Sequence, residues 1–228
     1  MGHSDGRRRP DVTTIEIVGG PEAVHVDLHP YDERWPTVFA EHRDRIRQAL
    51  GAGAGSVGIE HIGSTAVPGL AAKPIVDVLV TVDDITAEED HVEPLLAAGY
   101  ALRVREPGHR LVRTAERTVH VHVYEHGARA VEDYLLFRDR LRSDAADRAL
   151  YEDTKRELFR RQWDDMNAYS DAKTEVIEAI KARARAALPG HSGVRNRDQV
   201  VGVLRSMSSS DLAALVDEAR RAEQGTDL

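Results

Sequence analysis

The feature that most constrains the fold of this chain is an apolar run near its middle, Ile75-Val-Asp-Val-Leu-Val-Thr-Val82. Such a run is typical of a strand that is buried on both faces of a sheet. The run contains Asp77, and a carboxylate in this setting is costly unless it is paired, hydrogen-bonded or bound to a metal ion. Lys73, four residues earlier, is a candidate partner for it and equally a candidate phosphate ligand. We therefore expect a central strand that carries a functional group.

Hydrophobic periodicity predicts the other elements. Alternating or apolar segments indicate strands at residues 24–28, 57–62, 100–105, 109–114 and 118–124. Helical periodicity indicates helices at residues 36–50, 86–98, 129–142, 146–162 and 165–187. The second of these helices begins with Thr86-Ala-Glu-Glu89, which has the form of a capping box.

The chain is expected to have three segments. Residues 1–22 are rich in Arg, Gly, Pro and Asp without periodicity, and we expect them to form a mobile N-terminal arm. Residues 23–188 form the main domain. Residues 189–228 form a short helical extension whose amphipathic helices must pack on the domain or on a partner. Self-association through residues 190–228 is therefore one predicted use of the extension.

Composition limits the classes of function. No apolar stretch reaches the roughly 18 residues of a membrane span, and no secretory signal is recognisable, so we expect a cytoplasmic protein with no membrane partner. The net charge of -8 argues against broad nucleic-acid binding. Six acids within residues 83–93 supply much of that charge, so it does not argue against a compact phosphate-bearing ligand. Cysteine is absent, so a soft metal ligand would have to be a histidine.

A second informative segment precedes the central strand. Here a predicted strand ends at Gly63-Ser64. A glycine lets a ligand approach the backbone, and a hydroxyl can bond a phosphate oxygen. Alone, the Gly-Ser pair is equally typical of a plain turn, and Asp77 of an edge residue that caps a loop. Together, the pair and the buried carboxylate predict a functional site.

Two histidines alternate with valines in Thr118-Val-His-Val-His-Val-Tyr124. The period of two puts His120 and His122 on one face of a strand and the valines on the other, which we expect to face the core. With Asp77, the two imidazoles would bind one divalent ion of borderline softness, such as Mn²⁺ or Zn²⁺ rather than Mg²⁺. Alternatively, one histidine is a general base for an acceptor hydroxyl, or both lie on a solvated face.

The segment His61–Asp77 resembles the signature of the GrpB (UPF0157) family, and Leu135–Arg142 and Tyr151–Leu158 resemble the later helices of that family. The resemblance covers roughly residues 24–187. It implies the α+β class with a nucleotidyltransferase-like fold, in which a small mixed β-sheet is flanked by helices. The C-terminal helical extension is an addition to that fold.

The resemblance also implies site residues. In the wider nucleotidyltransferase superfamily, Gly-Ser is followed by Asp-x-Asp on the next strand and by a third acid, and these acids hold two Mg²⁺ ions that clamp a triphosphate. Asp77 matches the first acid, whereas Leu79 occupies the second position. The candidates for nucleotide or phosphate contact are Gly63, Ser64, Thr65, Lys73, Arg138 and Lys155.

Two functions follow from the resemblance. The first is a nucleotidyltransferase-type enzyme that moves a nucleoside monophosphate from an NTP to a small-molecule acceptor with a divalent metal, Mg²⁺, Mn²⁺ or Zn²⁺. Asp77 and His122 are its catalytic candidates, and Asp77, His120 and His122 are its metal ligands. Leu79 favours the second, a non-catalytic accessory module that binds a nucleotide or a phosphorylated metabolite on a degenerate transferase scaffold.

Overall fold

The computed structural model describes residues 10–20, 28–51, 57–160 and 172–188. The chain divides into two compact units, residues 1–182 and 183–228. The sheet and the candidate site belong to the first unit. The strand expected at residues 24–28, except for its last residue, and the helices expected within residues 190–228 lie outside the described residues.

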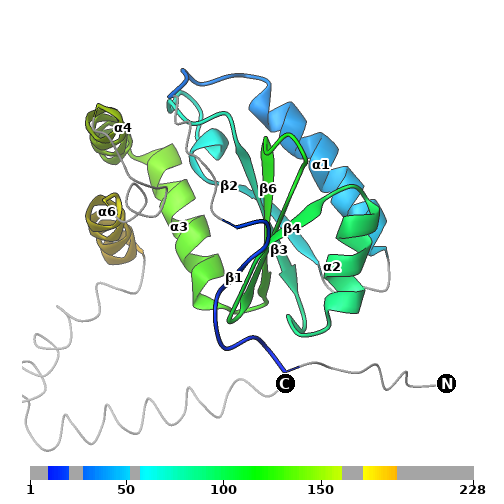
Figure 1. Cartoon of the computed structure of the whole chain (residues 1–228). Coiled ribbons are helices and arrows are strands. Elements are labelled where there is room, and N and C mark those ends of the chain that lie inside the picture. Colours follow the sequence, from blue (N-terminus) through cyan, green and yellow to red (C-terminus); the bar gives the residue numbers. More distant parts are fainter. Residues whose placement is uncertain (1–9, 21–27, 52–56, 161–171, 189–228) are drawn as a thin grey trace, which may run out of the picture. The chain divides into compact units, whose positions relative to one another are not determined.

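The described residues form a six-stranded mixed sheet in the order β1-β4-β5-β6-β3-β2 (Figure 1). Strand β3 (Val76–Val82) is parallel to β6 (Val119–Glu125) and antiparallel to β2 (Gly58–Ile62). Because β3 has a neighbour on each side, its backbone is paired on both edges. The prediction of a central strand here is confirmed.

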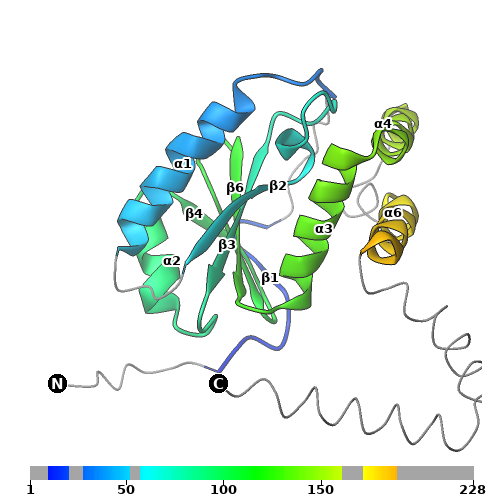
Figure 2. The ribbon, with the colours of Figure 1, turned by 180° about the vertical axis from the view of Figure 1, so that it is seen from behind.

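Helices α1 (Trp35–Leu50) and α2 (Glu88–Ala97) cover one face of the sheet (Figure 2). The valines of β6 point toward this face, as expected from the alternation, while His120 and His122 point away from it. The main core therefore lies between this face and these two helices; its residues include Ile46, Val78, Val80, Leu95, Val119, Val121 and Val123.

The other face is covered by α3 (Arg129–Ser143), which packs against α4 (Ala145–Phe159). α6 (Thr174–Ala187) begins in the first unit. A second apolar cluster joins these helices to the loop after β2, and it contains Val67, Leu70, Leu141, Tyr151 and Ile180. None of the described helices combines the length and apolarity of a membrane-crossing segment.

The remaining strands form one edge of the sheet. β4 (Ala101–Glu106) and β5 (His109–Arg113) are antiparallel, and β5 continues the antiparallel pairing to β6. The short helix η1 (Ser64–Ala66) follows β2 directly. The resulting architecture is the expected α+β class, with a mixed sheet flanked by helices.

Residues 10–20 differ from the expected mobile arm. Glu16–Ile17 form β1, which pairs antiparallel with β4 at the edge of the sheet. The physical reason is Arg110, which is 2% exposed and needs carboxylate partners. Asp11 supplies one partner at 2.8 Å and Glu88 the other at 2.6 Å. Asp11 also accepts a hydrogen bond from the Gly108 N–H, so it fastens the segment to the β4–β5 turn.

The expected capping box at the start of α2 is wrong. The helix begins at Glu88 with Ala87 at the N-cap position and no side-chain cap. The hydroxyl of Thr86 instead donates a hydrogen bond to Asp84 at 2.6 Å. Local side-chain bonding of this kind competes with helix capping, and here it shortens the helix by two residues.

Replacing Arg110 with alanine is expected to lower the free energy of unfolding by about 3 kcal/mol, because the carboxylates it holds lose a buried partner. Arg47→Ala is the matched control, since Arg47 makes only an exposed pair with Asp44 and its loss should have no measurable effect. Urea unfolding followed by circular dichroism measures both variants. Equal stabilities of the two would contradict the anchoring role of Arg110.

Candidate functional site

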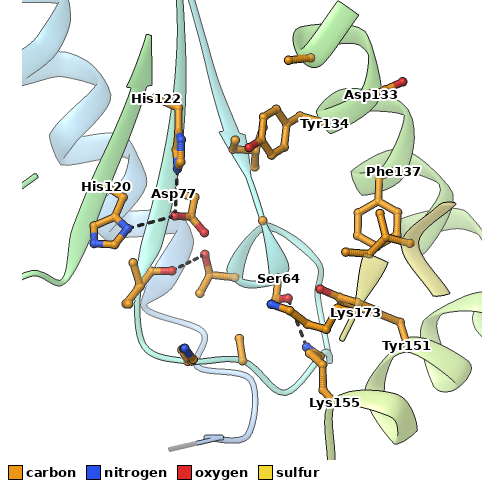
Figure 3. Close-up of a pocket in the computed structure, with 18 of the residues that line it drawn as sticks. Ser64, Asp77, His120, His122, Asp133, Tyr134, Phe137, Tyr151, Lys155 and Lys173 are labelled. Carbon is orange, nitrogen blue, oxygen red and sulfur yellow. Dashed lines mark hydrogen bonds and ion pairs between the residues drawn. The ribbon is translucent and has the colours of Figure 1, made fainter. Parts of the chain in front are cut away.

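A cavity of about 580 Å³ lies between strands β3 and β6 and helix α3, on the face of the sheet that α3 covers (Figure 3). Its apolar lining comes mainly from α3, α4 and the start of α6 and includes Tyr134, Phe137, Phe159 and Ile177. Its polar lining includes Ser64, Thr65, Lys73, Asp77, His120, His122, Lys155 and Lys173. All the site residues expected from the sequence line this cavity, except Arg138.

Asp77 and the two histidines meet because β3 and β6 are parallel neighbours. Asp77 pairs directly with His120 in the register, and His122 lies two residues further along β6. Asp77 Oδ1 is 3.8 Å from His120 Nδ1 and 3.5 Å from His122 Nε2. Both rings face the carboxylate in Figure 3. One donor atom from each of the three residues lies within 4.8 Å of the other two.

This donor set fits a divalent cation of borderline softness, because it combines one carboxylate oxygen with two imidazole nitrogens. Burial lowers the pKa of His120 and so favours the neutral ring that a metal ligand requires. The alternative of a solvated histidine face is not what the structure shows, because the side chains of His120 and His122 are only 23% and 16% exposed and line the cavity.

Gly63 allows the Asp77 carboxylate to lie where it does. The backbone of Gly63 has a φ of 72°, in the left-handed region, and it caps η1 as the chain turns after β2. A Cβ at this position would collide with Asp77 Oδ2. The glycine that the sequence associates with ligand access is therefore explained by packing within the protein, because a larger residue would leave no room for the carboxylate.

A polar cluster lies where η1 and α4 line the cavity, and it consists of Ser64, Tyr151 and Lys155 (Figure 3). Lys155 Nζ donates to Ser64 Oγ at 3.2 Å and to the carbonyl oxygen of Ala71. It also lies 4.8 Å from the centre of the Tyr151 ring. Burial lowers the pKa of Lys155 to about 7. A buried amine of this kind has lost hydration, and an anionic ligand would stabilise its charged form.

Two more amines face the same space. Burial lowers the pKa of Lys73 to about 8; Lys173 acts in the same direction, and Asp77 opposes it. Burial also lowers the pKa of Lys173. A fourth lining lysine, Lys181, lies 2.9 Å from Asp133. Asp77 and Asp133 are the carboxylates among the described lining residues, so the electrostatics of the cavity favour an anion.

Thr65 and Arg138 are held by contacts within the protein. Thr65 Oγ1 donates to the carbonyl oxygen of Ile75 and lies 3.1 Å from His61 Nε2. Arg138 donates to Glu60 Oε2 at 2.8 Å and to the carbonyl oxygen of His61 at 3.0 Å. Arg138 therefore joins α3 to β2, and its position gives no support to the expected phosphate contact.

Leu79 stands where the superfamily pattern has its second acid. It lies beside His122 in the register of β3 and β6 and is 1% exposed. Its side chain has no atom that binds a metal. The candidate metal donors are therefore one position on β3, Asp77, and two positions on β6, His120 and His122, in place of two acids on β3.

His109 and Lys173 were not expected in the site from the sequence. His109 Nε2 lies 3.1 Å from His122 Nδ1, behind the imidazole that faces Asp77. The strands expected at residues 109–114 and 118–124 were the available signal, because antiparallel pairing across the short connection between them brings His109 near His122. No sequence signal indicates Lys173, since its position depends on how the chain before α6 packs.

The chain is similar to proteins of one family. The sequence model of the GrpB protein family matches residues 25–183. A UPF0157 protein of Streptomyces coelicolor is 67% identical over 187 residues, covering 82% of this chain and 99% of the relative. The crystal structure of the conserved protein GrpB from Enterococcus faecalis has a TM-score of 0.60 at 31% identity, covering 69% of this chain and 96% of that one. The Cid1 poly(U) polymerase, solved with magnesium and 3'-dATP, has a TM-score of 0.44 at 14% identity, covering 57% and 44% of the two chains.

Gly63→Ala is expected to lower the free energy of unfolding by about 3 kcal/mol, from the strained φ and from the collision with Asp77. Gly108→Ala is a matched control, because Gly108 also has a φ of 72° but an added Cβ there meets nothing within 4 Å. The control should lose only about 1 kcal/mol. Urea unfolding measures both losses, and equal losses would show that the contact with Asp77 does not require the glycine.

Proposed function

The chain belongs to the GrpB family, and we propose that its cavity is the site of a metal-dependent nucleotidyltransferase. The enzyme would move a nucleoside monophosphate from an NTP to a small-molecule acceptor. One observation carries the proposal: a single cavity brings the Asp77 carboxylate and two imidazoles together with three lysine amines, of which that of Lys155 is buried and those of Lys73 and Lys173 are half-buried. The first group suits a divalent cation, and the second suits a polyphosphate.

Asp77, His120 and His122 would hold the metal ion, with Mn²⁺ or Zn²⁺ better matched to two nitrogen donors than Mg²⁺. When bound, a divalent ion neutralises phosphate charge and supplies Lewis acidity at the phosphoryl oxygens. Ser64 Oγ and the amines of Lys73, Lys155 and Lys173 would bind the phosphate chain. Ser64 and Lys155 are already within hydrogen-bond distance of each other, so one phosphate oxygen can contact both.

The proposed transfer is a displacement at the α-phosphorus. The acceptor hydroxyl oxygen forms the new bond to phosphorus, the bond to the bridging oxygen of the β-phosphate breaks, and pyrophosphate leaves with that electron pair. The hydroxyl proton passes to the Asp77 carboxylate, which lies on the cavity side of β3. His122 is the alternative base if its Nε2 is not a metal ligand. Positioning and charge stabilisation by the surrounding side chains supply most of the catalysis in this class of reaction.

Leu79 favours a second function, a binding module on the same scaffold that does not turn over its ligand. A second carboxylate on β3 would bring a second negative charge to the metal side of the cavity, and buried Leu79 brings none. The module would bind a nucleotide or a phosphorylated metabolite through the same lysines. The two functions differ in one measurable product, pyrophosphate.

Asp77→Ala is expected to abolish pyrophosphate release from an NTP with Mn²⁺, with the small-molecule fraction of a bacterial extract supplying the acceptor. Removal of a proposed metal ligand should also weaken Mn²⁺ binding by at least about 100-fold, since loss of outer-shell partners alone costs up to that much. Asp83→Ala is the control, because Asp83 follows β3 but its side chain is 70% exposed. Isothermal titration and a pyrophosphate assay measure both effects.

The outcomes of this experiment separate the two functions. Wild-type protein that binds no NTP with Mn²⁺ or Mg²⁺, or unchanged turnover in Asp77→Ala, would rule out the transferase. An NTP that raises the melting temperature without any pyrophosphate release would instead support the binding module, because binding alone stabilises the folded state.

Anion affinity is expected to fall between pH 6.5 and pH 9. The pKa values of Lys155 and Lys73 lie at about 7 and about 8, so both amines are largely charged at the lower pH and largely neutral at the higher one. Inorganic sulfate is a suitable probe because its own charge is constant over this range. We expect its affinity, measured by isothermal titration, to fall at least about tenfold. Lys155→Met should bind sulfate more weakly at pH 6.5 and with a flatter profile; a profile identical to that of the wild type would contradict the role of Lys155.

A further inference from the structure

A line of four side chains runs from the β4–β5 turn into the cavity. Glu106 Oε1 lies 2.5 Å from His109 Nδ1, and His109 Nε2 lies 3.1 Å from His122 Nδ1. On its far side, His122 Nε2 lies 3.5 Å from Asp77 Oδ1. Each imidazole therefore uses both of its ring nitrogens, one toward each neighbour in the line.

The β5–β6 pairing builds this line. His109 stands opposite Tyr124 in the antiparallel register, and His122 is its diagonal neighbour two residues away. The His109 ring stacks on Tyr124 with ring centres 4.4 Å apart and on His122 with centres 5.2 Å apart. His109 is 6% exposed, so packing fixes its ring plane as well as its hydrogen bonds.

The hydrogen bonds along this line all donate in one direction, toward Glu106, because its first member is a carboxylate. The Glu106 carboxylate only accepts hydrogen bonds, so His109 must carry a proton on Nδ1. The Nε2 of a neutral His109 then has a lone pair and accepts a hydrogen bond from His122 Nδ1–H. A neutral His122 with its proton on Nδ1 has a bare Nε2 facing Asp77, which is the state that can ligate a cation.

We propose that Glu106 and His109 are positioning residues that hold His122 in the Nδ1-protonated tautomer, with the Nε2 lone pair directed at the Asp77 side of the cavity. The inference rests on the metal site proposed above and deepens it. Histidine ligands are commonly oriented by a hydrogen bond that their second ring nitrogen donates to a carboxylate, a backbone carbonyl or a water molecule. Here the carboxylate would act through an intervening imidazole.

The tautomer can be measured in the metal-free protein. Long-range ¹H–¹⁵N correlation spectra of the histidine rings at pH 8 should show His122 protonated at Nδ1 in the wild type. In His109→Ala, we expect the proton to move toward Nε2, because the acceptor at Nδ1 is gone. Glu106→Gln leaves His109 unchanged but removes the carboxylate charge that holds the proton on His109 Nδ1. In this variant the His122 proton should also move toward Nε2, to a smaller extent. This second variant tests the inference if His109→Ala does not fold.

Metal affinity gives a second readout. We expect Mn²⁺ binding, measured by isothermal titration, to weaken by about 10- to 100-fold in His109→Ala and by about tenfold in Glu106→Gln. His42→Ala is the matched control: His42 is also buried and lies 2.7 Å from the Tyr100 hydroxyl, but it sits on α1 at the opposite face of the sheet. It should cost stability without changing the His122 tautomer or Mn²⁺ affinity.

Two results would overturn the positioning role. One is a wild-type His122 that carries its proton on Nε2. The other is a His122 tautomer that stays the same in both His109→Ala and Glu106→Gln. Wild-type protein that binds no Mn²⁺ would contradict the proposed function, whereas the tautomer in the metal-free protein decides the positioning role separately.

Discussion

The parallel pairing of β3 with β6 is the interaction on which the rest of the site depends. It places a carboxylate on one strand directly beside an imidazole on the next, at a spacing set by backbone hydrogen bonds and not by flexible side chains. The same pairing sends Val78 and Val121 into the core on the other face. A shift of the register by one residue would bury His120 and expose the valines to the cavity, so the packing that stabilises the sheet also fixes the site.

The chemistry on the cavity side follows from burial. Asp77 is tolerated there because its side chain stays 28% exposed and because Gly63 leaves room for its second oxygen. The lysines are tolerated in part by losing charge, since burial lowers the pKa of Lys155 to about 7. Side chains that are costly to bury have thus been collected in one place, an arrangement more typical of ligand sites than of structural cores.

Features that depend on the local sequence pattern are predicted from the sequence. Features that depend on which helices and strands pack together are not. The period of two in β6 is enough to place His120 and His122 on one face, and the apolar run is enough to identify β3. Neither pattern says that the two strands are neighbours, which only the structure shows. Lys173 has no signal at all, because only the packing of the helices brings it to the cavity.

The errors have the same origin. β1 forms because Arg110, buried by the packing of β5 against α2, requires a carboxylate that Asp11 provides from far along the chain. The expected cap of α2 fails because Asp84 offers the Thr86 hydroxyl a closer partner.

Leu79 has a consequence for the ligand that the cavity would prefer. With an acid at that position, the metal side of the cavity would carry two negative charges, enough to balance a divalent ion. With leucine there, the donors on that side carry only the charge of Asp77, and the imidazoles contribute none while they are neutral. A bound divalent ion would therefore leave this side net positive, facing three lysines that burial makes reluctant to stay charged. A ligand with several negative charges would compensate the excess positive charge of the ion. The same ligand would stabilise the protonated form of the lysine amines. The loss of the second acid thus argues less against a polyphosphate ligand than against the second metal ion.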